Sequence, residues 1–191
     1  LAESVAVDRV PLAVDLDSTL LRTDSLIESI FVLARLKPLT LLKLPGWWLK
    51  GRAHIKQRLA AIAMPDIHLL PHRVDLLEFL REQKRQGRSL ILATAADEKL
   101  AREVERDVGL FDAVFASDGE TNASGERKRD RLVAAFGLRG FDYIGNSARD
   151  YSVWCAARRA LRGSAFPTRT SAAPSRGPCD RSRSRTRAAS P

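Results

Sequence analysis

Two carboxylates placed two residues apart give the clearest chemical signal in the sequence. The segment Val14-Asp15-Leu16-Asp17-Ser18-Thr19-Leu20 follows directly on an apolar run that begins at Val10. If that run is a strand, Asp15 and Asp17 lie where it ends, and a turn beginning there lets both face one ligand pocket. Phosphoryl chemistry needs such a pair, because one carboxylate can serve as nucleophile and Mg²⁺ ligand while the other exchanges a proton. A solvated loop that contains two aspartates is the alternative.

Three further polar segments follow later apolar runs. Thr94 ends the second run, where a hydroxyl and the N–H groups of a helix N-terminus could bind an anion, although an ordinary N-cap is the interpretation we favour from the residues alone. Lys128 precedes an apolar helix inside a basic run, where a lysine is usually a solvated charge. The fourth run ends in a polar turn over residues 145–150 that contains Asn146 and Asp150.

The elements that must position these residues alternate along the chain. Apolar runs over residues 10–16, 89–93, 113–116 and 141–144 predict strands, and segments of helical period between them end at Gly87, Gly109 and Gly137. This alternation predicts an α/β fold with a parallel sheet and helices on its faces. Residues 25–63 have helical character instead, so we expect a helical cap over the carboxyl edge of the sheet, where ligands of such folds bind.

The order of these four motifs resembles the haloacid dehalogenase (HAD) superfamily of Mg²⁺-dependent phosphotransferases over roughly residues 10–160. That superfamily has a DxDxT motif, a strand-end Thr or Ser, a Lys and an acidic turn. The sequence around these motifs is similar to the HAD-like domain at the N-terminus of some bacterial UbiA-type prenyltransferases. The similar segments are 15–26, 48–53, 93–98, 117–119 and 145–154.

The resemblance implies a HAD-like Rossmannoid sheet with a helical cap inserted after the first strand. It also implies catalytic roles. Asp15 would be the nucleophile that becomes an aspartyl phosphate, and Asp17 would act as general acid and then base. Thr94 would hold the phosphoryl oxygens, and Lys128 would neutralise charge on the nucleophile and the phosphate.

A Mg²⁺ cofactor is implied in the same way. Its predicted ligands are Asp15, the backbone carbonyl of Asp17, Asn146 and Asp150. The superfamily usually has Asp where this sequence has Asn146, and a neutral oxygen should hold Mg²⁺ less firmly. Asp150 could compensate through a bound water.

The predicted domain organisation has three parts. Residues 1–24 and 71–160 form the α/β core, residues 25–70 the cap, and residues 161–191 a disordered tail rich in Arg, Ser and Pro. No apolar run follows Ala157, so we expect the edge strand that the family would place there to be missing. Trp47 and Trp48 stand beside lysines, a combination typical of a membrane interface, although packing of the cap onto the sheet is the interpretation we favour.

Charge and composition exclude several classes of protein. The net charge is +9, but the tail carries seven arginines and one acid, which leaves a mildly basic body. Nucleic-acid binding through the tail is not favoured, because no aromatic residue follows Phe166 to stack on bases. Charges and prolines interrupt the apolar stretch 26–49, so it does not predict a membrane span. Two cysteines cannot form a disulfide framework, which favours a cytoplasmic protein.

The expected function is therefore a Mg²⁺-dependent phosphatase that hydrolyses a phosphomonoester through an aspartyl phosphate. By association the resemblance suggests a polyprenyl or sugar phosphate as substrate, a membrane prenyltransferase as partner, and a peripheral membrane location through that partner. The alternative is a catalytically impaired HAD-like domain, the remnant or regulator of a UbiA-type prenyltransferase, which Asn146 and the missing strand favour.

Overall fold

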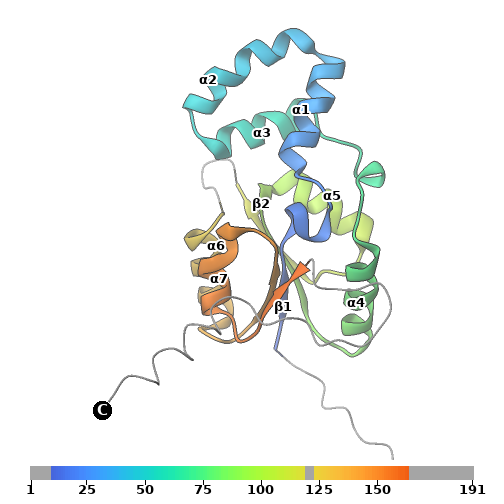
Figure 1. Ribbon diagram of the computed structural model, residues 1–191, viewed down its shortest axis with the longest axis vertical. Helices are drawn as coiled ribbons and strands as arrows, with labels where there is room; N and C mark the ends of the chain where they lie inside the picture. The colour runs from blue at the N-terminus through green and yellow to red at the C-terminus, as the bar shows by residue number, and fades with distance from the viewer. Residues whose placement is uncertain (1–9, 119–122, 164–191) are drawn as a thin grey trace, which may run out of the picture.

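A parallel sheet of five strands lies at the centre of the computed structural model, which describes residues 10–118 and 123–163 (Figure 1). The strand order is β3-β2-β1-β4-β5 and every pairing is parallel. The strands are β1 (Leu12–Val14), β2 (Leu90–Asp97), β3 (Ala113–Ser117), β4 (Asp142–Gly145) and β5 (Ala160–Arg162). The predicted α/β class is confirmed.

Helices cover both faces of this sheet. Helices α4 (Val74–Arg85) and α5 (Glu98–Val108) pack on one face, and α6 (Glu126–Phe136) and α7 (Tyr151–Ala156) on the other (Figure 1). Successive side chains of a strand point to opposite faces of the sheet. Leu12 and Val14 therefore pack with α4 and α5, whereas Ala13 packs with α6 and α7. Because both faces are covered, the central strand β1 consists of apolar residues alone.

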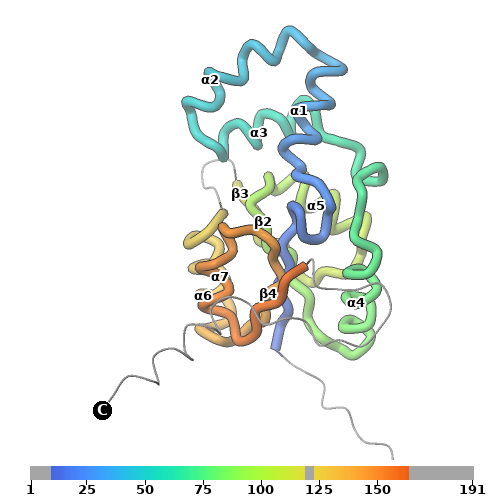
Figure 2. The backbone as a smooth tube through the Cα atoms, viewed as in Figure 1, coloured from blue at the N-terminus to red at the C-terminus, as the bar shows by residue number. Residues whose placement is uncertain are grey.

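The cap is a separate helical unit beyond the carboxyl ends of the strands, and the tube in Figure 2 shows the chain leaving β1 into it and returning to α4. It contains α1 (Ser25–Leu36), η2 (Pro38–Lys43), α2 (Leu44–Leu49) and α3 (Arg52–Ile62). Its own small core is built from Leu33, Ile55, Leu59 and Ala63. The chain rejoins the core at η3 (Ile67–Leu69), since Ile67 packs with the sheet's cluster.

The expectation of a missing edge strand was wrong. Residues 160–162 form β5, which pairs with β4 and buries Leu161 opposite Ile144. The strand is three residues long and has one large apolar side chain, so no periodic pattern marks it in the sequence. Residues 164–191 of the predicted tail lie outside the described residues.

The two cap tryptophans do not pack on the sheet, contrary to the interpretation favoured above. Trp47 packs against the cap's own core. Trp48 is 55% exposed, with the guanidinium of Arg52 5.9 Å from its ring centroid. Within residues 10–118 and 123–163, no helix has the length and apolar character needed to cross a membrane.

Candidate active site

Asp15 lies at the carboxyl end of the central strand. Strand β1 runs between β2 and β4, and the Asp15 N–H extends the ladder by donating to the Ile144 carbonyl at 2.9 Å. The backbone then turns through η1 (Leu16–Leu20), so the Asp15 side chain is buried beneath the cap rather than in solvent. Within that turn, the Thr19 hydroxyl donates to Asp15 Oδ2 at 3.4 Å.

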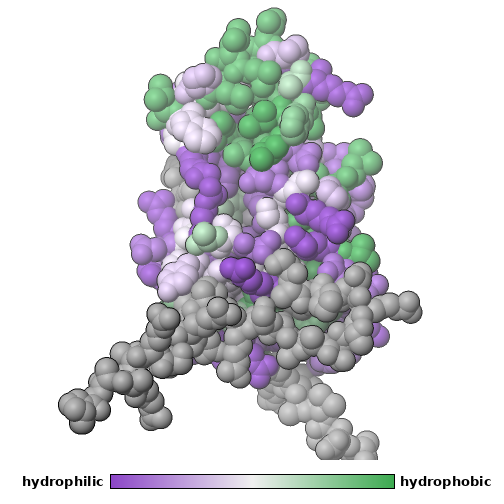
Figure 3. Space-filling view, viewed as in Figure 1, coloured by the Kyte–Doolittle hydropathy of each residue, from purple (hydrophilic) through white to green (hydrophobic). Residues whose placement is uncertain are grey.

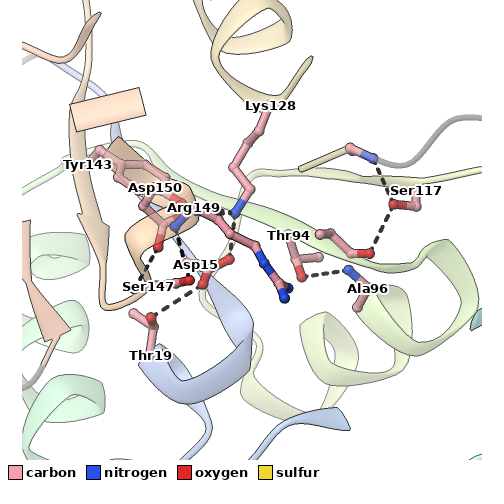
Figure 4. A network of polar contacts seen from close by, with 12 residues as sticks. Asp15, Thr19, Thr94, Ala96, Ser117, Lys128, Tyr143, Ser147, Arg149 and Asp150 are labelled. Atoms are coloured by element: carbon pink, nitrogen blue, oxygen red, sulfur yellow. Dashed lines mark hydrogen bonds and ion pairs between the residues drawn. The ribbon is translucent and has the colours of Figure 1, made fainter. Parts of the chain in front are cut away.

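Lys128 is the partner of Asp15, and Figure 4 shows it reaching down from α6. Its Nζ lies 2.7 Å from Asp15 Oδ1 and 3.4 Å from Asp150 Oδ1, and it also donates to the Tyr143 hydroxyl at 3.0 Å. Lys128 is 4% exposed. It is therefore not the solvated charge that its basic sequence neighbours predict.

Asp150 holds Lys128 in place. Its Oδ1 accepts from the Tyr143 hydroxyl at 2.7 Å, and its Oδ2 accepts from the Ser147 N–H at 3.0 Å, in the capping box of the short helix η4 (Ala148–Asp150). A Cβ at Gly145 would lie 2.7 Å from Asp150 Oδ2, so glycine leaves the room that this carboxylate needs. Because protein donors occupy both oxygens, the arrangement makes Asp150 a support for Lys128, and its role as a metal ligand stays a prediction.

Asp17 is held at the junction of the core and the cap. Its Oδ1 accepts from the Ser25 N–H at 2.9 Å, at the first residue of α1. Ser18 has a φ of 59°, an uncommon value for a residue with a side chain. Asn146 donates its amide Nδ2 to the Ser18 carbonyl at 3.1 Å and so stabilises this turn. The two acids and Asn146 therefore meet at one edge of the sheet.

Thr94 does not occupy a helix N-terminus. Strand β2 continues to Asp97, which caps α5, so the favoured reading of Thr94 as an N-cap was wrong. Thr94 is fully buried, and its hydroxyl accepts from the Ala96 N–H at 2.9 Å (Figure 4). It lies on the strand beside β1, near Asp15, but it is absent from the residues that line the pocket described below.

Thr19 and Tyr143 also contribute to the site, although the motifs assign neither of them a role. Thr19 is the threonine of the Asp-x-Asp-x-Thr spacing, so that spacing could have indicated it. Tyr143 looks like an ordinary apolar strand residue, and only the three-dimensional structure shows its hydroxyl between Lys128 and Asp150.

Burial dominates the electrostatics of the two acids. It raises the pKa of the Asp15 carboxyl from 3.8 to about 6, since Lys128 offsets only part of the burial penalty and Asp150 adds to it. Burial also raises the pKa of Asp17, against the hydrogen bond from Ser25. Burial alone would lower the pKa of Lys128, but the carboxylates of Asp15 and Asp150 together raise it above its usual value. Lys128 is therefore a permanent cation beside Asp15.

The site opens into a pocket between the core and the cap. Asp15, Asp17, Lys128 and Asp150 line it together with three further cations, Arg52 and Lys56 from α3 and Arg149 from η4. Lys56 also donates to the carbonyl of Ala95 on β2 and thereby joins the cap to the core. Burial lowers the pKa of Lys56. Asp24 also lines the pocket, so four acids face four cations there, and Arg52, Lys56 and Arg149 are the cations outside the Lys128 cluster that an anionic ligand could contact.

The oxygen atoms at this edge suit a hard divalent cation. Asp15 and Asp150 share the single buried cation Lys128, so the cluster is negative when both acids are ionised. Asn146 uses its amide nitrogen on Ser18, which leaves its oxygen as the group for a cation. Among the residues that the structure describes, no three His, Cys, Asp or Glu side chains form a metal-binding group.

No family model matches the sequence. The uncharacterised protein y4nM of Sinorhizobium fredii is 37% identical to it over 153 residues, which cover 80% of this chain and 30% of that protein. The chain thus spans less than a third of the curated relative that it matches.

Several solved structures have the same fold, and three of them follow. A protein of unknown function from Bordetella pertussis has a TM-score of 0.60 at 19% identity, covering 93% of this chain and 95% of that one. A HAD family hydrolase of Salmonella enterica serovar Typhi gives 0.58 at 16% identity, over 80% and 63% of the two chains. A substrate-bound phosphoserine phosphatase gives 0.56 at 15% identity, over 81% and 86%. The chain therefore shares its fold with HAD-family hydrolases.

Proposed function

We propose that the chain is a phosphatase of the HAD type that uses Asp15 as its nucleophile. The observation that carries the proposal is the buried Asp15 carboxylate, 2.7 Å from Lys128 Nζ, at the base of a pocket lined by further cations. A carboxylate paired with a buried lysine remains ionised for attack, while the surrounding cations attract the phosphate dianion.

The proposed reaction has two steps. An Asp15 oxygen forms a bond to phosphorus while the ester P–O bond breaks, and the leaving oxygen takes a proton from Asp17. Water then attacks the phosphorus of the aspartyl phosphate, Asp17 accepts a proton from that water, and inorganic phosphate leaves Asp15. The raised pKa of Asp17 supports its part, since a carboxylic acid that donates near neutral pH needs a pKa above the ordinary value.

Mg²⁺ would be held by Asp15, the Asp17 carbonyl and Asn146, and it would offset the negative charge of the phosphate as it approaches a carboxylate. Lys128 supplies the protein's own positive charge beside Asp15. Thr94 is proposed to contact the phosphoryl oxygens. Its hydroxyl oxygen accepts from the Ala96 N–H and so keeps a hydrogen to donate, but Thr94 is fully buried and outside the pocket lining, so a contact with the phosphate would require a local shift.

The substrate is proposed to carry an anionic or polar group beyond the reacting phosphate, because Arg52 and Lys56 approach the pocket from the cap. Of the two candidate classes, a sugar phosphate meets this requirement through its hydroxyl groups, whereas the hydrocarbon chain of a polyprenyl phosphate would leave Arg52 and Lys56 without a polar partner on the substrate. Phosphate release from a panel of phosphomonoesters, with and without Mg²⁺, tests the proposal. We expect Asp15→Asn to abolish release, whereas the matched control Asp130→Asn, at an exposed position on α6, should retain it. Equal release by Asp15→Asn and wild type would contradict the mechanism.

A catalytically impaired domain is the second candidate, and Asn146 favours it. Asn146 has a structural role that does not require catalysis, because its amide donates a hydrogen bond to the Ser18 carbonyl. An impaired domain, for example the regulator of a membrane prenyltransferase, predicts no turnover of any phosphomonoester at any Mg²⁺ concentration by a folded protein.

A further inference from the structure

The apex of the cap has a large exposed apolar surface. Leu39, Leu42 and Leu49 are 81%, 81% and 88% exposed, and Phe31 and Trp48 are also exposed. Figure 3 shows hydrophobic surface gathered over the cap, while the visible core below it is mostly hydrophilic. Soluble monomers seldom leave a patch of this kind without a partner.

These side chains are not needed to hold the cap together. The cap core consists of Leu33, Ile55, Leu59 and Ala63, with other residues packed against it, and neither η2 nor α2 buries a residue fully. The apex also lies at the end of the molecule away from the sheet (Figure 1), so closing the cap onto the core would not cover it. The exposed leucines therefore have no function in the fold itself.

The charge around this apolar surface has one sign. No Asp or Glu occurs from Ser29 to Pro65, a stretch that holds seven Lys and Arg residues. Of these, Arg35, Lys37, Lys43 and Lys50 are exposed among the apolar side chains of the apex. Leucine and tryptophan interleaved with lysine is the composition of segments that lie in the interface of an anionic membrane.

We propose that this apex, defined by Leu39, Leu42, Trp48 and Leu49 with Lys37, Lys43 and Lys50, docks on a membrane surface that carries anionic lipid headgroups. Its apolar side chains insert among the upper acyl chains and its lysines contact the headgroups. Since no described helix can span a bilayer, the contact is interfacial. Acidic groups within the patch would favour a protein partner instead, because mixed charges fix one orientation of binding. This stretch has no acidic group. The inference does not depend on the phosphatase activity.

Sedimentation with vesicles tests it on the full chain. One set of vesicles contains phosphatidylcholine alone and the other also contains phosphatidylglycerol. We expect binding to the anionic vesicles, and we expect the combined Leu39→Gln, Leu42→Gln and Leu49→Gln variant to reduce the bound-to-free ratio by about ten-fold or more. Tryptophan emission should shift to shorter wavelength on binding, and Trp48→Phe should remove most of that shift.

A matched control replaces exposed apolar residues of the core, which are 81%, 63% and 69% exposed, in the combined Leu69→Gln, Val74→Gln and Leu138→Gln variant. It should bind as the wild type does, and circular dichroism establishes that both triple variants are folded. Charge removal by Lys37→Gln, Lys43→Gln and Lys50→Gln should abolish the preference for anionic vesicles.

Three results would overturn the proposal. The first is a wild type that binds neither kind of vesicle. The second is anionic binding that the cap variants leave unchanged, which would place the contact elsewhere, for example in the arginine-rich residues 164–191. The third is a wild type that binds both kinds of vesicle equally weakly but self-associates, as measured by sedimentation velocity. If the cap leucine variant abolishes that self-association, the apex joins copies of this chain instead.

Discussion

Lys128 Nζ lies 2.7 Å from Asp15 Oδ1, and both side chains are almost completely buried. The same ammonium lies 3.4 Å from Asp150 Oδ1, so one cation serves two acids. Removing Lys128 would leave two carboxylates that water reaches poorly, and this is costly because their desolvation penalty is no longer offset.

We therefore expect Lys128→Met to lower the free energy of unfolding by about 3–5 kcal/mol, measured by urea denaturation at neutral pH. The double variant Lys128→Met with Asp15→Asn should recover part of that loss, since it removes one of the two carboxylates left behind. Additive effects of the two substitutions would contradict the shared ion pair. Exposed Lys99→Met, on α5, is the control and should change stability little.

The raised pKa of Asp15 predicts a pH-dependent cost in stability. Its folded pKa of about 6 exceeds the ordinary 3.8, so the folded state binds the proton more tightly than the unfolded chain does. The cost of ionising Asp15 is absent below pH 3.8, develops as the pH rises toward about 6 and is complete above it.

Asp15→Asn cannot ionise, and Lys128 keeps Asp150 as its partner, so this variant should be more stable than the wild type by about 1–3 kcal/mol at pH 8. The difference should shrink as the pH is lowered toward 4. Urea titrations in EDTA at several pH values measure it, because chelation keeps divalent cations from stabilising the wild type. A difference that does not change with pH would contradict the assigned burial penalty.

Asn146 gives a prediction about the metal. Asn146→Asp supplies a charged oxygen in place of a neutral one, so the Mg²⁺ concentration for half-maximal phosphate release should fall by about ten-fold. The amide that holds the Ser18 carbonyl is lost with it, so we expect a small decrease in thermal stability in EDTA. Asn146→Ala removes both functions and should raise the Mg²⁺ requirement. An unchanged Mg²⁺ dependence in both variants would exclude Asn146 from the metal site.

The sequence predicts those parts of the site that are marked by neighbouring residues, and it misses those that depend on contacts between distant segments. Asp15 and Asp17 were placed at a strand end because an apolar run stops just before them. The burial of Lys128 had no local signal: Arg127 beside it is exposed, and only the start of α6 at Glu126 turns Lys128 toward the sheet. Its link to Tyr143 joins side chains 15 residues apart on different elements, which no pattern of spacing reveals.

The errors about the fold have equally physical causes. Strand β5 is too short to show a period. Ala95 and Ala96, which follow Thr94, favour a helix over a strand, so the sequence predicts a cap at Thr94, whereas β2 continues through them to Asp97.

The cap cations give the last prediction. Arg52 and Lys56 line the pocket, whereas Arg58 lies exposed on the same helix, α3, and outside the pocket lining. If the cap recognises an anionic group beyond the reacting phosphate, Arg52→Ala should raise KM for such a substrate by about ten-fold and leave kcat nearly unchanged, because it removes binding that ground state and transition state share. Arg58→Ala should alter neither constant. A small aryl phosphate has no second anionic group, so its KM should change much less in Arg52→Ala. A similar rise in KM for both substrates would mean that Arg52 contacts the reacting phosphate itself, and a loss confined to kcat would mean that it acts on the chemical step rather than on recognition.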